Sequence, residues 1–177
     1  MKKNYGFTLV ELLLVVALTS LAVGITGDIL VSLIRGYNKS NVITEIEQNA
    51  NFVSQKLNKE LRNASQITDL GGIAPPPQGT TGDTISLVDR DGFDITYSIA
   101  NGILFRDYDS GGNDPLTAND PPRGVNVTCP TSCFTLLEDQ PQVVQISIQI
   151  EQAGTPSTVV FQGEINIEDT VVIRDTY

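Results

Sequence analysis

Hydrophobic residues run almost without interruption from Phe7 to Gly27. Glu11 is the one charged side chain among these 21 residues. As an α-helix the run would span roughly 30 Å, close to the hydrocarbon thickness of a bilayer. Two lysines precede it and Asp28 follows it, so the positive-inside rule predicts one membrane crossing, with the N-terminus in the cytoplasm and the remainder outside.

Beyond Asp28 the apolar residues recur at steps of three and four, which is typical of one buried face of a helix. They are Ile43, Ile46, Ala50, Val53, Leu57, Leu61 and Ala64. The pattern predicts one helix from Phe7 to about Ala64, of which only the second half packs in a domain. Gly24 and Gly27 are weak helix formers inside it, and such small residues suit close packing between helices.

The helix is predicted to end in a solvent-exposed connector from Ser65 to Gly82, because Gly71-Gly72 and three consecutive prolines cannot continue it. Alternating apolar and polar residues then predict three antiparallel strands. Their apolar positions are Ile85 and Leu87 in the first, Phe93, Ile95, Tyr97 and Ile99 in the second, and Ile103 and Phe105 in the third. Asn101-Gly102 between the last two strands is a strong hairpin signal.

The same alternation returns in the C-terminal third and predicts two more strands, with a turn at Ala153 to Pro156 between them. The apolar positions are Val144, Ile146, Ile148 and Ile150 in one strand and Val159, Phe161, Gly163, Ile165 and Ile167 in the other, which Val171 to Ile173 would extend. One antiparallel sheet of these strands would cover the apolar stripe of the helix. The expected fold class is therefore α+β, with a long N-terminal helix packed on an antiparallel sheet.

Composition argues against catalysis. The 177 residues leave room for one domain beyond the apolar run, and they include no histidine, no tryptophan and two cysteines. This inventory removes most nucleophile–base pairs and most transition-metal sites. Residues 66–177 carry four basic and sixteen acidic side chains, and such an acidic surface disfavours binding to nucleic-acid phosphates or to an anionic membrane.

The region from Asp107 to Gly124 is predicted to be a loop of eighteen residues, long enough to need a reason. Its candidate metal ligands are Asp107, Asp109, Asn113 and Asp114. Hard oxygen ligands around flexible glycines suit calcium, although the spacing fits an EF-hand poorly. A solvated loop without a metal explains the same residues. No other cofactor is expected.

Cys129 and Cys133 lie four positions apart, and outside the cytoplasm we expect them to form a disulfide. The spacing has one residue too many for the redox motif with two intervening residues. Zinc would need two further ligands, and the chain has no histidine.

The segment Gly6-Phe7-Thr8-Leu9-Val10-Glu11 resembles the N-terminus of type IV pilins and of the pseudopilins of type II secretion. In that family a prepilin peptidase cuts after the glycine and methylates the new N-terminal amine. The resemblance implies processing at Gly6, methylation of Phe7, and pairing of Glu11 with the amine of Phe7 on a neighbouring subunit. Two other interpretations stay open: Glu11 near the interface, snorkelling or protonated, and a secretory signal cleaved at 22–24.

The resemblance implies a pilin-like fold and the following organisation: a leader peptide at 1–6, a transmembrane helix at 7–28, an amphipathic helix half at 29–65 and a β-rich domain at 66–177. Residues 48–64 also resemble the larger minor pilins and the J-type pseudopilins. In this family the helix near Gly24 can melt when the subunit enters a filament.

The function we expect is that of a structural subunit of a type IV pilus or related filament, not an enzyme. A type II secretion pseudopilin and a tip-located minor pilin that binds a surface or DNA are the alternatives; a membrane-anchored hydrolase is poorly supported. Implied partners are other pilin subunits, the prepilin peptidase, the inner-membrane assembly machinery and the membrane before assembly, with no direct nucleic-acid contact. The implied location is the inner membrane, then a periplasmic or extracellular filament.

Overall fold

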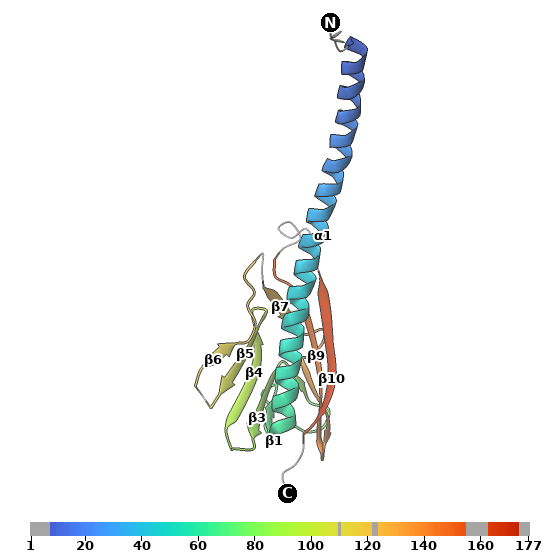
Figure 1. Ribbon diagram of the computed structural model, residues 1–177. Helices are drawn as coiled ribbons and strands as arrows, with labels where there is room; N and C mark the ends of the chain where they lie inside the picture. Colours follow the sequence, from blue (N-terminus) through green and yellow to red (C-terminus); the bar gives the residue numbers. More distant parts are fainter. Residues whose placement is uncertain (1–7, 110, 122–123, 155–162, 174–177) are drawn as a thin grey trace. The chain divides into compact units, whose positions relative to one another are not determined.

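One helix, α1 (Leu9–Asn63), dominates the computed structural model, which describes residues 8–109, 111–121, 124–154 and 163–173 (Figure 1). The predicted helix end near Ala64 is confirmed, whereas the predicted start at Phe7 lies outside the described residues. Gly24 and Gly27 do not interrupt α1, and a Cβ added at either glycine would meet no atom within 4 Å.

The chain forms two compact units, residues 1–41 and 42–177. In the first unit the described part of α1 is exposed all round, because no other element packs against it. In the second unit α1 buries one face. The residues of that face are Ile46, Ala50, Val53, Leu57 and Leu61. They are five of the seven positions that the three–four periodicity selected.

The described strands form two five-stranded antiparallel sheets, where the sequence pattern led us to expect one sheet. The first sheet has the order β1-β3-β4-β5-β6; in the second, β10-β9-β8-β2 are neighbours and β7 pairs with β9. The bounds are β1 Ala64–Leu70, β2 Thr81–Gly82, β3 Thr84–Asp89, β4 Asp94–Ala100, β5 Ile103–Tyr108, β6 Asn113–Pro115, β7 Val125–Thr128, β8 Phe134–Asp139, β9 Gln142–Gln152 and β10 Glu164–Val172.

A single hydrophobic core joins the buried face of α1 to both sheets. Leu57 and Leu61 of α1 are fully buried, as are Leu87 of β3 and Ile146 of β9. Figure 1 shows the C-terminal part of α1 running across the strands, with β4 to β6 on one side and β9 and β10 on the other. The α+β prediction of a helix packed on antiparallel strands is therefore confirmed.

The connector predicted from Ser65 onward is wrong for its first part, because residues 64–70 form β1. This strand pairs with β3, and its buried residues are Ala64, Ile67 and Leu70. Their spacing is three rather than two because the pairing register shifts twice, between Ala64 and Gln66 and between Ile67 and Asp69. These irregularities hide the strand from a search for strict alternation.

The hairpin at Asn101-Gly102 is confirmed, since both residues have positive φ and connect β4 to β5. The strand predicted around Ile146 is also confirmed as β9. Its partner β10 begins at Glu164, and the residues from Val159 to Phe161 lie outside the described part of the chain. Strands β7 and β8 were not predicted.

Candidate functional site

Glu11 lies in the first turn of α1 and is hydrogen-bonded to Thr8. Its Oε2 accepts a hydrogen bond from the backbone N–H of Thr8 at 3.1 Å and another from the Thr8 hydroxyl at 3.0 Å. In return, the backbone N–H of Glu11 donates to Thr8 Oγ1 at 3.3 Å. This reciprocal arrangement is a capping box, which satisfies N–H groups that a helix start leaves unpaired. The Thr-x-x-Glu spacing could have revealed it in the sequence.

The described first part of α1 presents apolar side chains on every side. By length and composition α1 can cross a membrane once, and the apolar stretch lies near the N-terminus. Leu9 is 75% exposed, and the leucines, valines and isoleucines that follow it as far as Ile34 are also exposed. An apolar surface of this extent fits contact with lipid or with other helices rather than with water.

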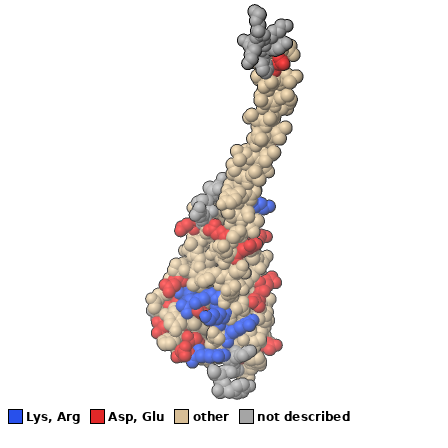
Figure 2. All heavy atoms as spheres, viewed as in Figure 1, with Lys and Arg blue, Asp and Glu red and all other residues tan. Residues whose placement is uncertain are grey.

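Basic side chains gather around the C-terminal end of α1. Figure 2 shows Lys and Arg side chains on one face of the second unit, bordered by acidic ones. The described basic residues of this unit are Lys56, Lys59, Arg62, Arg90 and Arg106. One of them, Lys56, forms an ion pair with Glu60 at 2.7 Å, and Arg106 Nε contacts the same carboxylate at 2.9 Å.

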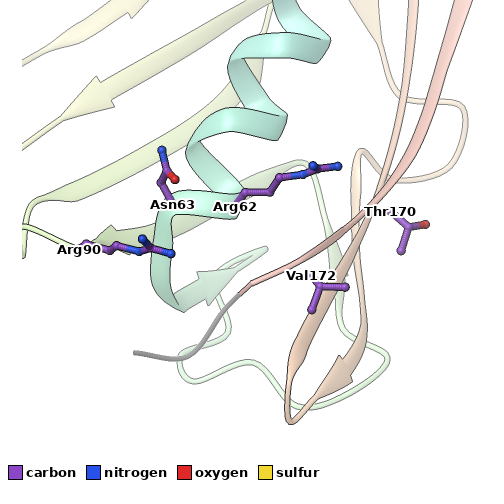
Figure 3. Close-up of a pocket in the computed structure, with 5 residues that line it drawn as sticks. All are labelled: Arg62, Asn63, Arg90, Thr170 and Val172. Carbon is purple, nitrogen blue, oxygen red and sulfur yellow. The ribbon is translucent and has the colours of Figure 1, made fainter. Parts of the chain in front are cut away.

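A cleft of about 430 Å³ opens beside this helix end, lined by Arg62, Asn63, Arg90, Thr170 and Val172. Arg62 belongs to the last turn of α1, Arg90 to the turn between β3 and β4, and the other wall to β10. In Figure 3 the Arg62 side chain extends from the helix end toward Thr170 and Val172 of β10, and Arg90 approaches the helix end from the opposite side. We refer to this hollow as the Arg62–Arg90 cleft.

A second hollow of about 440 Å³ shares Asn63 and Arg90 with the first. Its charged lining residues are Lys59, Arg90 and Arg106 on the basic side and Glu60, Asp89 and Asp91 on the acidic side. Positive and negative charges are balanced here. The Arg62–Arg90 cleft, in contrast, has no carboxylate among its described lining residues.

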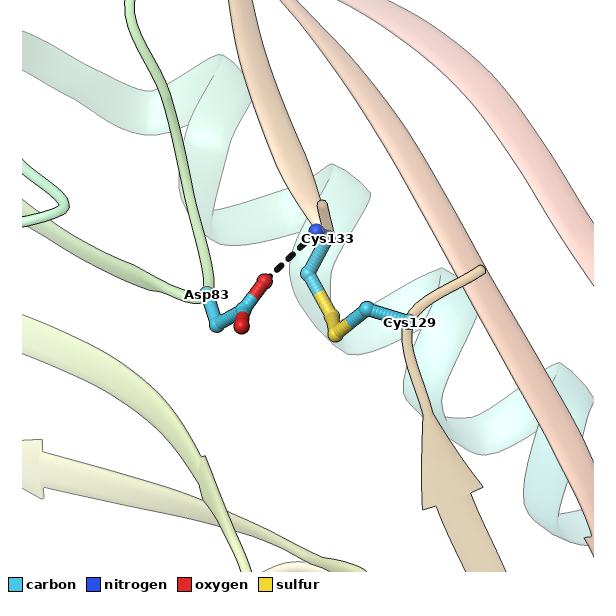
Figure 4. Close-up of side chains that lie close together, drawn as sticks. All are labelled: Asp83, Cys129 and Cys133. Atoms are coloured by element: carbon cyan, nitrogen blue, oxygen red, sulfur yellow. Dashed lines mark hydrogen bonds between the residues drawn. A yellow bond between two sulfur atoms is a disulfide. The ribbon is translucent and has the colours of Figure 1, made fainter. Parts of the chain in front are cut away.

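Cys129 and Cys133 are joined in a disulfide, as predicted (Figure 4). The disulfide spans the connection between β7 and β8, and the backbone N–H of Cys133 donates to Asp83 Oδ1 at 3.2 Å. Potential ligand atoms of Asp83 and the two cysteines lie within 4.8 Å of one another. Because both sulfurs are in the disulfide, neither is a free thiolate for a metal.

The predicted calcium ligands lie on the hairpin of β5 and β6. The pairing register places Asp107 opposite Asn113 and Arg106 opposite Asp114. Since paired residues share a face and the faces alternate along a strand, Asp107 and Asn113 lie on one side and Asp114 on the other. Asp109 follows β5 with a φ of 51°. The predicted eighteen-residue loop is thus shortened by β6.

Residues 1–27 match the family model described as the prokaryotic N-terminal methylation motif. This match supports a member of the type IV pilin and pseudopilin family. No match was found among curated proteins or among solved structures. The motif indicates a structural subunit, and it implies processing by a prepilin peptidase and assembly with other pilins.

For a pilin or pseudopilin, the three residues predicted to matter most lie inside the matched range. Gly6 and Phe7 lie outside the described residues. Glu11 is described, and its partner is Thr8. The apolar α1 and the motif together fit a membrane-anchored protein with an exposed C-terminal domain.

Proposed function

We propose that the chain is a filament subunit of a type IV pilus or a related assembly, cut after Gly6 and methylated on Phe7. Its first unit crosses the inner membrane with the N-terminus in the cytoplasm. After processing, α1 moves from lipid into a bundle with the helices of other subunits, and Glu11 pairs with the amine of Phe7 on a neighbour.

The observation that carries this proposal is the methylation motif at residues 1–27, followed by a helix that stays apolar and exposed up to about Ile34. The same helix then enters a folded domain through the buried face from Ile46 to Leu61. A simple anchor has no need for Glu11, because a carboxylate in a membrane-spanning helix costs on the order of 3 kcal/mol at mid-membrane. A subunit that must recognise a neighbouring N-terminus has a use for it.

The mass of the mature protein tests the processing step. Intact mass spectrometry of membrane-extracted protein should find a chain that begins at N-methylated Phe7, and a strain without prepilin peptidase should retain Met1. Gly6→Leu should block the cut, whereas the matched change Gly24→Leu in α1 should leave it unaffected. A mature N-terminus near Ile25 would instead identify a secretory signal and refute the proposal.

A pseudopilin of a type II secretion system is the alternative, and it shares the processing and assembly steps. Deletion of the gene distinguishes the two: loss of sheared surface filaments identifies a pilus subunit, and accumulation of secreted proteins in the periplasm identifies a pseudopilin.

A further inference from the structure

The second unit is acidic, but its described basic side chains gather in one place. Acidic residues outnumber basic ones nineteen to seven over residues 42–177. Yet the described basic side chains of this unit all lie around one end of α1, in or next to the two hollows. The rarer charge, gathered on an otherwise acidic surface, creates a local positive potential suited to an anionic partner.

Part of this cluster is explained by the fold itself. Lys56 and Arg106 bind Glu60, and Arg62 lies in the last turn of α1, where a cation complements the helix dipole. Arg90 has neither explanation. It lies in a turn between strands, and among the described residues neither Arg62 nor Arg90 forms an ion pair.

The two arginines therefore line one hollow that has no carboxylate among its described lining residues, although Arg90 also lines the second hollow, whose acidic residues are Glu60, Asp89 and Asp91. Asp169 of β10 is not among the lining residues, and its Oδ2 accepts a hydrogen bond from Asn58 Nδ2 at 2.6 Å. Two like charges on the same cleft repel each other, and an anion between them removes that repulsion. Thr170 and Asn63 also line the cleft, and a hydroxyl and an amide can each donate hydrogen bonds.

We propose that the Arg62–Arg90 cleft binds carboxylate side chains of an acidic protein segment. The planar guanidinium fork matches a carboxylate with two parallel hydrogen bonds, and two forks from different elements can hold two neighbouring carboxylates. The volume of about 430 Å³ lies within the ordinary range of ligand sites. Nucleic acid is disfavoured, because its phosphates need a long track of cations and the surrounding surface is acidic.

We take the acidic segment to come from a second copy of this chain, because residues 42–177 are themselves acidic. A second copy offers exposed acidic pairs such as Glu138-Asp139 at the end of β8. The identification of a neighbouring filament subunit as the partner rests on the proposed function, whereas the carboxylate chemistry of the cleft does not.

Calorimetric titration of the full chain in non-ionic detergent tests the cleft. A peptide of about six glutamates should bind at about 50 mM salt, and binding should weaken on the order of tenfold at about 300 mM salt. Peptides of the same length made of glutamine or lysine should not bind. The double variant Arg62→Glu/Arg90→Glu should lose binding.

The matched control is Arg35→Glu/Lys39→Glu, which makes the same change in net charge on the first part of α1. It should bind the glutamate peptide as the parent does. No binding to the parent, equal loss in the control, or equally tight binding of a single-stranded oligonucleotide would each overturn the proposal.

Sedimentation of the same samples tests whether a second copy is the partner. Self-association that Arg62→Glu/Arg90→Glu abolishes identifies a second copy as the partner; peptide binding without self-association supports the cleft and assigns the segment to another protein. The mature mass beginning at Phe7 tests the filament role separately, so either result can fail while the other stands.

Discussion

The hydroxyl of Tyr97 on β4 donates a hydrogen bond to Oε2 of Glu60 on α1. Arg106 Nε on β5 donates to the same oxygen at 2.9 Å, and Lys56 Nζ lies 2.7 Å from Oε1. The Glu60 carboxylate thus connects α1 to two strands of the first sheet. Because Tyr97 is fully buried, its hydroxyl needs a hydrogen-bond partner inside the protein, and Glu60 provides it.

The network makes stability depend on pH at both ends of the scale. Burial alone would raise the pKa of Glu60, but hydrogen bonds from Lys56, Tyr97 and Arg106 outweigh it, so this pKa lies below its ordinary value of 4.5. Its contribution is present above pH 4.5 and is lost as pH falls through the lowered pKa. Burial first, and then the bond to Glu60, raise the pKa of Tyr97 above 10.0, so that contribution is present below pH 10 and declines above it.

Glu60→Gln should therefore lower the free energy of unfolding by about 2 kcal/mol at neutral pH and flatten the loss of stability in acid. Tyr97→Phe should cost about 1 kcal/mol and flatten the loss above pH 10. Urea unfolding of the full chain in non-ionic detergent, across the pH range, measures both. Glu138→Gln, an exposed acid outside the network, is the control; an equal effect there would remove the special role of Glu60.

The core between α1 and the sheets gives a second prediction. Leu57 is fully buried in the second unit, with 0% of its surface exposed. Leu57→Ala should therefore lower the free energy of unfolding by about 3 kcal/mol. Phe52 on the same helix is 49% exposed, and Phe52→Ala should stay within about 0.5 kcal/mol. The same urea titrations compare them, and equal losses would mean that α1 does not pack as described.

Leu57 and Tyr97 show how far the sequence could predict the fold. The spacing that selects Leu57 is local, since helix periodicity places it on the face with Leu61 and Val53, and both are buried. Tyr97 was recognised as an inward strand position for the same reason. Neither pattern contains the contact between Tyr97 and Glu60, because that contact depends on how α1 meets β4.

Long-range pairing explains the remaining differences. The division into two sheets depends on which strands pair across distant stretches, such as β2 with β8. No short window of sequence encodes that choice. The Arg62–Arg90 cleft was missed for the same reason, because its two arginines are far apart in the chain and meet only in the fold. The capping box of Thr8 and Glu11, in contrast, is local, and the Thr-x-x-Glu spacing in the sequence could have revealed it.

The disulfide should be complete in the exported protein. Thiol labelling without reductant should find Cys129 and Cys133 blocked, and reduction should release both. In the chain-entropy model a loop of this length contributes about 2 kcal/mol, so Cys129→Ser/Cys133→Ser should lower the free energy of unfolding by about that amount. Thr131→Ala in the same loop is the control, and reactive thiols in the untreated protein would contradict the expectation.

Calcium binding on the β5–β6 hairpin stays a prediction. If the site exists, millimolar calcium should raise the melting temperature of the full chain in detergent relative to chelator, because a ligand specific to the folded state stabilises it by mass action. Asp107 and Asn113 share a face of the hairpin, so Asp107→Asn should remove the shift more completely than Asp114→Asn. An unchanged melting temperature would leave a solvated hairpin.

Two roles of Glu11 can be separated by mutation: the capping box that it forms with Thr8 at the start of α1, and the proposed pairing with a neighbouring subunit. Glu11→Val removes both the charge and the capping box, and it should insert into the membrane at least as well as the parent. Glu11→Gln removes the charge alone, because glutamine also completes a capping box. Thr8→Val removes the two hydrogen bonds of the Thr8 hydroxyl, leaves the one from the backbone N–H, and keeps the charge of Glu11.

If pairing with the amine of Phe7 is what Glu11 serves, Glu11→Gln and Glu11→Val should both be processed, reach normal levels in the membrane and enter filaments several-fold less than the parent. Thr8→Val should then enter filaments nearly normally, because it keeps the Glu11 carboxylate that pairs with the amine of Phe7. In a low-dielectric setting the main contribution of such an ion pair is to fix the register between subunits. The measurement is the ratio of processed protein in sheared filaments to processed protein in membranes. Normal incorporation of Glu11→Gln with poor incorporation of Thr8→Val would assign Glu11 to the helix start, and loss of Glu11→Val from the membrane would show that insertion depends on the carboxylate.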